Sequence, residues 1–311
     1  MSPPNGFTSL QIPISLLNLH TVLTSGQSFL WHIYPLSPPH PQSHEYRLCI
    51  TDRLICLRQD NTHIYYRTVF PTSSSSPTET TESWLNSYFQ LSVNLPSLYT
   101  SFSLDPHFAR LALRPQLQGI RILRQDPWEC LLSFLCSQNN HIARITNMVH
   151  SLPEHFSLIL VHEPHPSQDR TVQYRPFPAP EVLAKEGVES QLRALGFGYR
   201  AKYVSHTASA LCSASPPGRA KLLELRTLPL PQAREFLLSL PGVGPKVADC
   251  TLLMSLDQPG VVPVDTHVLR VAKRYYGLKL GKGMGGGKGY ERVAQGLRDV
   301  WGEWAGWAQG V

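Results

Sequence analysis

A lysine and an aspartate in the last third of this chain could carry covalent chemistry, because each stands at the predicted start of a helix. The stretch from 240 to 267 reads L-P-G-V-G-P-K-V-A-D-C and, further on, P-V-D-T-H. Lys246 opens the first of these helices, where the positive end of the helix dipole disfavours an ammonium group. We therefore expect a depressed pKa that leaves part of Lys246 as a nucleophilic amine.

Asp265 is predicted to be the N-cap of the second of these helices. The apolar residues that follow it recur at helical spacing, namely Val268, Val271, Ala272 and Tyr275. A capping carboxylate is held rigidly and stays ionised because it accepts backbone N–H groups. Such a group could stabilise positive charge that develops on a sugar.

A helix, a tight turn and a further helix must position the lysine. We predict helices over 232–240 and from 245 to about 256, joined by a turn in which Gly242 and Gly244 supply unusual backbone conformations. Pro245 suits the first turn of a helix. The unpaired N–H groups at this helix start attract an anion, and a DNA phosphate is a natural occupant.

This segment resembles the helix-hairpin-helix, Gly/Pro-rich loop and aspartate of the DNA glycosylase superfamily. Its amino-acid sequence is most similar to that of eukaryotic 8-oxoguanine DNA glycosylases. L-P-G-V-G alone also occurs in non-enzymatic DNA-binding hairpins, but Lys246 together with Asp265 favours an enzyme. The resemblance covers nearly all of the chain. It implies a bifunctional glycosylase and AP lyase that flips 8-oxoguanine out of damaged double-stranded DNA. Lys246 would attack the deoxyribose C1′ and form a Schiff base, and Asp265 would stabilise the sugar cation.

The resemblance also implies three residues that contact the flipped base. Gly26, in T-S-G-Q-S-F-L-W, matches the glycine whose carbonyl accepts the N7–H of 8-oxoguanine, a hydrogen that guanine lacks. Cys250 matches the cysteine that packs against the base, and Gln309 the residue that reads its Watson–Crick edge. By composition alone, Gly26 is a turn glycine and Cys250 a buried structural thiol.

The DNA contacts implied by the resemblance come from two further segments and from the hairpin. Asn139 would fill the space left by the flipped base, Arg144 and Arg200 would bind the orphaned cytosine, and Tyr199 would insert as a wedge. Gly242, Gly244 and His267 would lie against phosphates. Each of these residues also has a plainer interpretation. Asn139 would belong to a turn that ends a helix, Tyr199 would pack on its own turn, and His267 would be an ordinary exposed histidine. Lys246 would only bind a phosphate, and Asp265 would be a purely structural cap.

The sequence departs from the family pattern at three places. His141 replaces a third asparagine, and Pro245 replaces a more polar residue before the lysine. The sequence also ends two residues after Gln309, where the family continues the helix with an aromatic that stacks on the base. From this departure we expect weakened base recognition by the chain as written; an incomplete gene sequence would explain the same departure.

Composition limits the class of protein. The 311 residues carry a net charge of +6, which fits a nucleic-acid partner, and the six cysteines form no C-x-x-C pair, so we expect reduced thiols in an intracellular protein. The iron–sulfur loop of endonuclease III relatives is absent after Cys250, and no run of about 20 apolar residues predicts a membrane helix. We expect a monomer without metal or redox cofactor, working in the nucleus, with the mitochondrion as a second compartment.

The predicted fold class is α+β, with an N-terminal antiparallel sheet and helices over 1–125 and an all-α catalytic region over 126–311. Strands are predicted over 28–34, 46–50, 54–57 and 64–70, and helices over 82–89 and 107–113. Asp126 to Glu129 predicts a capping box at a helix start, and Ile142 opens the next helix. We expect loops over 72–81, 162–180 and 279–289, and a final helix with Trp301, Trp304 and Trp307 on a core face.

Two other functions stay open at the level of sequence. One is a glycosylase for another oxidised or alkylated base, against which Gly26, Arg144 and Arg200 argue together. The other is a non-catalytic DNA-damage-binding protein, which would form no covalent intermediate with DNA.

Overall fold

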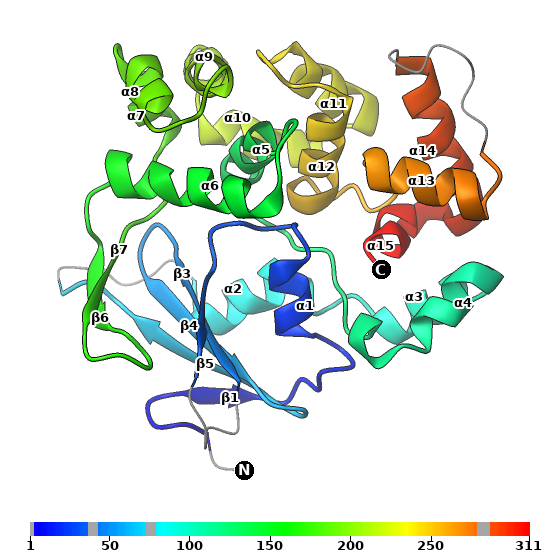
Figure 1. Ribbon diagram of the computed structural model, residues 1–311, viewed down its shortest axis with the longest axis horizontal. Coiled ribbons are helices and arrows are strands. Elements are labelled where there is room, and N and C mark those ends of the chain that lie inside the picture. The colour runs from blue at the N-terminus through cyan, green and yellow to red at the C-terminus, as the bar shows by residue number, and fades with distance from the viewer. Residues whose placement is uncertain (1–2, 37–42, 73–78, 279–286) are drawn as a thin grey trace.

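The computed structural model describes residues 3–36, 43–72, 79–278 and 287–311. An antiparallel sheet forms one part of the molecule, and most of the helices pack together in the other part (Figure 1). The predicted α+β fold is therefore confirmed. The main hydrophobic cluster takes buried side chains from both parts, among them Leu57 of the sheet and Leu131 and Leu252 of the helices.

The N-terminal sheet has five strands in the order β1-β5-β4-β3-β2, and every neighbouring pair is antiparallel. The strands are β1 (Thr8–Leu10), β2 (His32–Pro35), β3 (His44–Cys49), β4 (Leu54–Gln59) and β5 (Ile64–Val69). The predicted meander is confirmed in β2 to β5, whereas β1 was not predicted. The strand predicted over 28–34 begins only at His32, because Phe29, Leu30 and Trp31 enter the core as an irregular segment instead of pairing.

Short helices accompany this sheet and carry strong local start signals. They are α1 (Leu19–Thr24), α2 (Thr81–Tyr88), α3 (Leu95–Phe102) and α4 (Pro106–Ala112). A side-chain oxygen caps each of them, from Asn18, Thr80, Asn94 and Asp105 respectively. The predicted helices over 82–89 and 107–113 are confirmed. Part of the predicted loop over 72–81 lies outside the described residues.

The second part of the chain is mostly helical. Its helices are α5 (Pro127–Cys136), α6 (Ile142–Phe156), α7 (Pro180–Leu183), α8 (Val188–Ala194), α9 (Arg200–Cys212), α10 (Arg219–Glu224), α11 (Leu230–Ser239), α12 (Pro245–Ser255), α13 (Thr266–Tyr275), α14 (Gly287–Trp301) and α15 (Ala305–Gln309). Every residue of α5 is buried, and this central helix packs against α12. In the described part of the chain, no helix has both the length and the apolar character needed to cross a bilayer.

The prediction of a loop over 162–180 is wrong, because this stretch forms most of an antiparallel hairpin of β6 (Val161–Pro164) and β7 (Thr171–Tyr174). Val161 and Tyr174 are buried in one cluster with Cys49, Leu54 and Tyr65 of the N-terminal sheet. The hairpin thus packs on the sheet, although it belongs to the later part of the chain. The many prolines and polar residues of this stretch predicted a surface loop, although a few apolar side chains make this contact.

The prediction of a single final helix is also wrong. Gly302 has a φ of +70° and ends α14, and a short turn (Gly302–Trp304) separates it from α15. The three tryptophans nevertheless pack in one hydrophobic cluster, as predicted, with Trp307 buried and Trp301 and Trp304 half-buried. Of the loop predicted over 279–289, residues 279–286 lie outside the described residues, and 287–289 belong to α14.

Only half of the predicted capping box forms at the start of α5. Asp126 accepts hydrogen bonds from the N–H groups of Trp128 and Glu129, each at 3.0 Å. Among the described residues, Oε1 of Glu129 has no hydrogen-bond partner, and the side chain is 8% exposed. Glu129 turns into the protein interior instead of reaching back to the cap.

Candidate active site

A cavity of about 190 Å³ contains all five residues predicted to carry catalysis or to contact the base. It opens between the loop after α1, helix α12, the start of α13 and the end of α15. The predicted residues that line it are Gly26, Lys246, Cys250, Asp265 and Gln309. The fold therefore gathers at one place residues that are far apart in the sequence.

Lys246 lies in the first turn of α12, with Gly244 as the N-cap residue and Pro245 in the first helical position. Its Nζ donates a hydrogen bond of 3.1 Å to Oγ of Ser137 and lies 4.5 Å from the centre of the Phe134 ring. In the part of the chain that the structure describes, no carboxylate oxygen lies within 4.0 Å of this Nζ. The amine is held by contacts that it can give up without breaking an ion pair.

Asp265 is the N-cap of α13, as predicted. Its Oδ1 accepts hydrogen bonds of 2.9 Å from the N–H groups of both His267 and Val268. The cap uses only Oδ1, and among the described residues no hydrogen bond reaches Oδ2, so this oxygen can interact with a group in the cavity. Capping and charge stabilisation are therefore compatible roles for this side chain.

Cys250 lies one helical turn after Lys246 and is 2% exposed. Burial raises the pKa of its thiol to about 12, an effect that the neighbouring Lys246 opposes. The thiol is therefore neutral at physiological pH. A neutral thiol suits packing against the face of a base and does not suit nucleophilic attack.

Backbone constraints fix the two remaining residues of the cavity. Gly26 has a φ of +82°, which explains why a glycine is required there. Gln309 ends the short helix α15, which packs closely on the chain beside it. A Cβ on Gly306 of this helix would lie 2.3 Å from the carbonyl oxygen of Val261, so only glycine permits this approach.

The turn between α11 and α12 also depends on a glycine. Gly242 has a φ of +78°, and a Cβ there would lie 2.3 Å from Cγ of Tyr203 in α9. Gly244 differs, since the space around its Cα is open. The turn is thus packed on α9 at one glycine and accessible at the other, which is where a phosphate would approach the helix start.

A second group of predicted residues lies where the turn after α5 meets the bend before α9. Asn139 is exposed and has a φ of +46°. Nη2 of Arg144 donates a hydrogen bond of 3.1 Å to the Gly196 carbonyl, and the hydroxyl of Tyr199 donates one of 3.3 Å to the Gln138 carbonyl. Tyr199 is 47% exposed, so its ring is accessible from the solvent.

Arg200 belongs to this second group, but it is buried, with 3% of its surface exposed. It donates to the carbonyl of Gln138 and, at 3.0 Å, to the carbonyl of Asn139. Its guanidinium therefore holds the asparagine turn in this structure, and cytosine recognition would require it to give up part of these bonds. His267 is exposed at the start of α13.

Sequence reasoning missed several residues that shape the two sites. Phe134 and Ser137 flank the lysine, and His141 caps α6 by accepting a hydrogen bond of 3.4 Å from the Arg144 N–H. The position of His141 just before the first helical residue was a usable signal. The pairing of Ser137 with Lys246 had none, because these residues are 109 positions apart.

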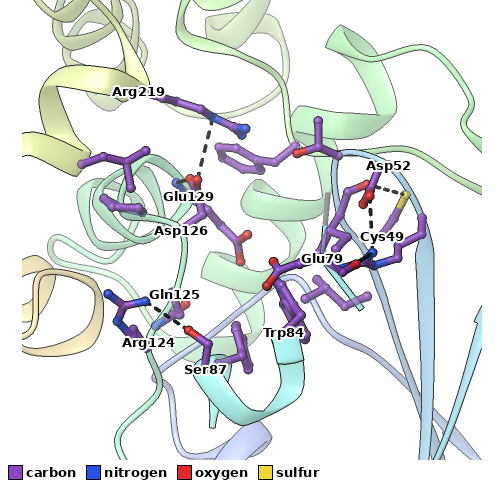
Figure 2. Close-up of a pocket in the computed structure, with 18 of the residues that line it drawn as sticks. Cys49, Asp52, Glu79, Trp84, Ser87, Arg124, Gln125, Asp126, Glu129 and Arg219 are labelled. Carbon is purple, nitrogen blue, oxygen red and sulfur yellow. Dashed lines mark hydrogen bonds and ion pairs between the residues drawn. The ribbon is translucent and has the colours of Figure 1, made fainter. Parts of the chain in front are cut away.

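A larger cavity, of about 470 Å³, lies elsewhere, between the turn after β3, helix α2 and the start of α5 (Figure 2). It contains none of the residues predicted for catalysis or DNA binding. Figure 2 shows Glu129 beside Asp126 and Arg219. Burial, with a contribution from Asp126, raises the pKa of Glu129 to about 8, and Arg219 opposes this shift.

Two family profiles match this chain. The profile described as "8-oxoguanine DNA glycosylase, N-terminal domain" matches residues 9–131, and the one described as "HhH-GPD superfamily base excision DNA repair protein" matches residues 132–301. The second match includes Lys246, Cys250 and Asp265. The two matches together account for most of the chain.

Relatives of known activity match over nearly the whole chain. The N-glycosylase/DNA lyase of Saccharomyces cerevisiae is 36% identical over 98% of this chain and 85% of its own length. The N-glycosylase/DNA lyase OGG1 of Arabidopsis thaliana is 38% identical over 96% of this chain and 77% of its own length. A solved structure of MBOgg1 in complex with a low affinity DNA ligand has a TM-score of 0.79 at 27% identity, covering 99% of this chain and 94% of that one. The chain therefore belongs to the HhH-GPD superfamily of base excision DNA repair proteins, as a DNA-binding N-glycosylase/DNA lyase.

Proposed function

We propose that this N-glycosylase/DNA lyase removes 8-oxoguanine opposite cytosine from damaged double-stranded DNA, acting as a monomer in the nucleus and also in the mitochondrion. The observation that carries the proposal is the single cavity that contains Lys246, Asp265 and Gly26 together. The match of the N-terminal part to a profile described for 8-oxoguanine glycosylases supports the choice of base.

In the proposed reaction, the neutral amine of Lys246 attacks C1′ of the flipped nucleotide. The bond from C1′ to N9 breaks, its electron pair leaves with the base, and the base takes up a proton as it departs. A proton then passes from the amine to O4′ as the bond from C1′ to O4′ breaks, which opens the sugar ring and leaves a protonated Schiff base between Nζ and C1′. Loss of a proton from C2′ next breaks the bond from C3′ to oxygen, and the strand is cut at the 3′ phosphate.

The charges around the cavity fit this order of reaction steps. The carboxylate of Asp265 is fixed by two backbone N–H groups, so it can face a developing sugar cation without having to reorient. The lysine exchanges its hydrogen bond to Ser137 for the substrate, and this exchange leaves no charge unpaired in the protein.

Discrimination between the damaged and the normal base rests on a single acceptor. 8-Oxoguanine carries a hydrogen on N7, which the Gly26 carbonyl would accept, whereas guanine presents a lone pair there. A carbonyl that faces a lone pair loses its hydrogen bond and is repelled, which disfavours the normal base. Cys250 would pack on the face of the base, and Gln309 would bind its Watson–Crick edge.

Opposite-base recognition would use the second group of residues. Tyr199 is exposed and would enter the helix at the flipped base, and Asn139 would occupy the vacated space. Arg144 and Arg200 together present donors that match the acceptors of cytosine.

The test is borohydride trapping on a duplex with one 8-oxoguanine opposite cytosine, using the wild type and Lys246→Gln. We expect a covalent adduct with the wild type alone. If the wild type binds the lesion but gives no adduct, the chain is a damage-binding protein and the proposal is wrong. If the wild type traps only on duplexes that carry a different damaged base, the lysine chemistry stands and the assignment of 8-oxoguanine is wrong.

A further inference from the structure

We infer that Gln27 and Gln125 are positioning residues, which lock the peptide after Gly26 so that its carbonyl discriminates 8-oxoguanine from guanine. The inference rests on the proposed function and deepens it. Both side chains are almost completely buried, with 4% and 1% of their surfaces exposed.

The side-chain amide of Gln27 pairs with the extended segment that leads into α5. Its Nε2 donates a hydrogen bond of 3.0 Å to the Arg121 carbonyl, and its Oε1 accepts one of 3.0 Å from the Leu123 N–H. The amide thus bonds to the backbone on both sides of Ile122, another residue of the cavity wall. Gln27 itself also lines the cavity, but both ends of its amide are engaged by backbone groups, so the side chain holds the loop in place.

Gln125 continues this connection to the catalytic helix. Its Nε2 donates a hydrogen bond of 2.9 Å to the Gln27 carbonyl, and its own N–H donates one of 2.8 Å to the carbonyl of Met254 in α12. Helix α12 also carries Lys246. A continuous chain of hydrogen bonds therefore fixes the Gly26 loop relative to the nucleophile.

The orientation of one peptide group explains why this lock affects specificity. The peptide between Gly26 and Gln27 presents a carbonyl on one side and an N–H on the other. If it turned over, the N–H would replace the carbonyl and would pair with the bare N7 of guanine. Gly26 has a φ of +82° and no side chain, so its own backbone does little to prevent this rotation. The two buried glutamines hold the side chain and the carbonyl of Gln27, and so fix the residue that ends this peptide.

The test compares two similar glutamines. In the Lys246→Gln background, Kd is measured for duplexes with 8-oxoguanine or guanine opposite cytosine, with and without Gln27→Ala. We expect the preference for 8-oxoguanine to fall about tenfold, as the loss of buried hydrogen bonds predicts. With Lys246 in place, Gln27→Ala should cut a preformed abasic site at nearly the wild-type rate, because that substrate has no base to read.

Gln59 provides the matched control. Its side-chain amide also bonds two backbone groups, with Oε1 accepting from the Leu19 N–H at 2.8 Å and Nε2 donating to the Leu17 carbonyl at 2.5 Å. These bonds lie at the start of α1, whereas Gly26 follows its end. Gln59→Ala should lower Tm as Gln27→Ala does, but leave the preference for 8-oxoguanine unchanged.

A second substitution protects the test against misfolding. Gln27→Met keeps the length and most of the volume of the side chain but removes both the donor and the acceptor, so it should lose the preference as Gln27→Ala does without leaving a cavity. An unchanged preference in both Gln27 variants, or an equal loss in Gln59→Ala, would overturn the inference. If the Lys246→Gln protein with Gln27 intact does not prefer 8-oxoguanine, the proposed function is wrong instead, and this result is seen before any Gln27 variant is made.

Discussion

The side-chain amide of Gln138 donates a hydrogen bond of 2.6 Å to the carbonyl of Gly242. Through this contact, the turn that carries Asn139 is joined to the hairpin that precedes Lys246. The backbone carbonyl of Gln138 meanwhile accepts bonds from Tyr199 and Arg200. One residue therefore links the surface proposed to read the opposite strand to the helix that carries the nucleophile.

We predict that Gln138→Ala lowers the preference for cytosine over adenine opposite the lesion. The turn would lose its attachment to the hairpin, at a cost of about 1 kcal/mol, and Asn139 and Arg200 would be less precisely placed. The measurement is kcat/KM on 8-oxoguanine paired with each base. If both values fall by the same factor, Gln138 has only a structural role.

Gly242→Ala should destabilise the protein by more than Gly187→Ala. The two glycines have similar φ values, +78° and +80°, but only at Gly242 would a Cβ clash, whereas nothing lies within 4 Å of the position at Gly187. The left-handed conformation alone costs about 1–2 kcal/mol, and the clash with Tyr203 should add about 1–3 kcal/mol. Urea unfolding of both variants measures the difference, and equal destabilisation would show that Tyr203 moves aside without cost.

Asp265→Asn should separate capping from charge. Asparagine caps helices about as well as aspartate, so Tm should change little, while excision should fall by at least about 100-fold because the sugar cation loses its counter-charge. Asp265→Ala should lose both stability and activity. Single-turnover excision and thermal unfolding of the two variants provide the measurements, and an active Asp265→Asn would restrict this residue to capping.

The stability of the protein should depend on pH through Glu129. Burial raises the pKa of this carboxyl from 4.5 to about 8, so the folded state keeps a proton that the unfolded state has lost. This group therefore contributes its full stability below the unfolded pKa, and the contribution is lost as pH rises through the folded value.

Glu129→Gln removes this dependence. Relative to the variant, the wild type should lose stability from about pH 5 to about pH 8, by at most about 1.4 kcal/mol per pH unit. Unfolding by urea across this range measures the difference between the two proteins. A constant difference would mean that Glu129 ionises in the folded protein at its ordinary pKa.

Features with local signals could be predicted from the sequence. The glycines around the hairpin, Pro245 before the lysine and the cap at Asp265 all depend on neighbours a few residues away. The antiparallel strands β2 to β5 were predictable for the same reason, since each is a short run of strand formers between breaks.

Features that depend on distant contacts could not be predicted. Nothing near Arg200 in the sequence shows that it will be buried against the carbonyls of Gln138 and Asn139. Likewise, Gln27 resembles any polar residue after a turn, and only the fold brings it to Arg121 and Leu123. The break at Gly302 was a missed local signal, because a glycine inside a helical pattern permits a left-handed residue.

The β6–β7 hairpin limits how this protein can be rearranged. A catalytic region transplanted without the N-terminal sheet would carry Val161 and Tyr174 into water, and the sheet would lose the cover over Cys49 and Leu54. Neither part could be replaced on its own by the corresponding part of another protein. A lineage that replaced one part would have to acquire matching substitutions in the other, so the two parts are expected to be inherited together.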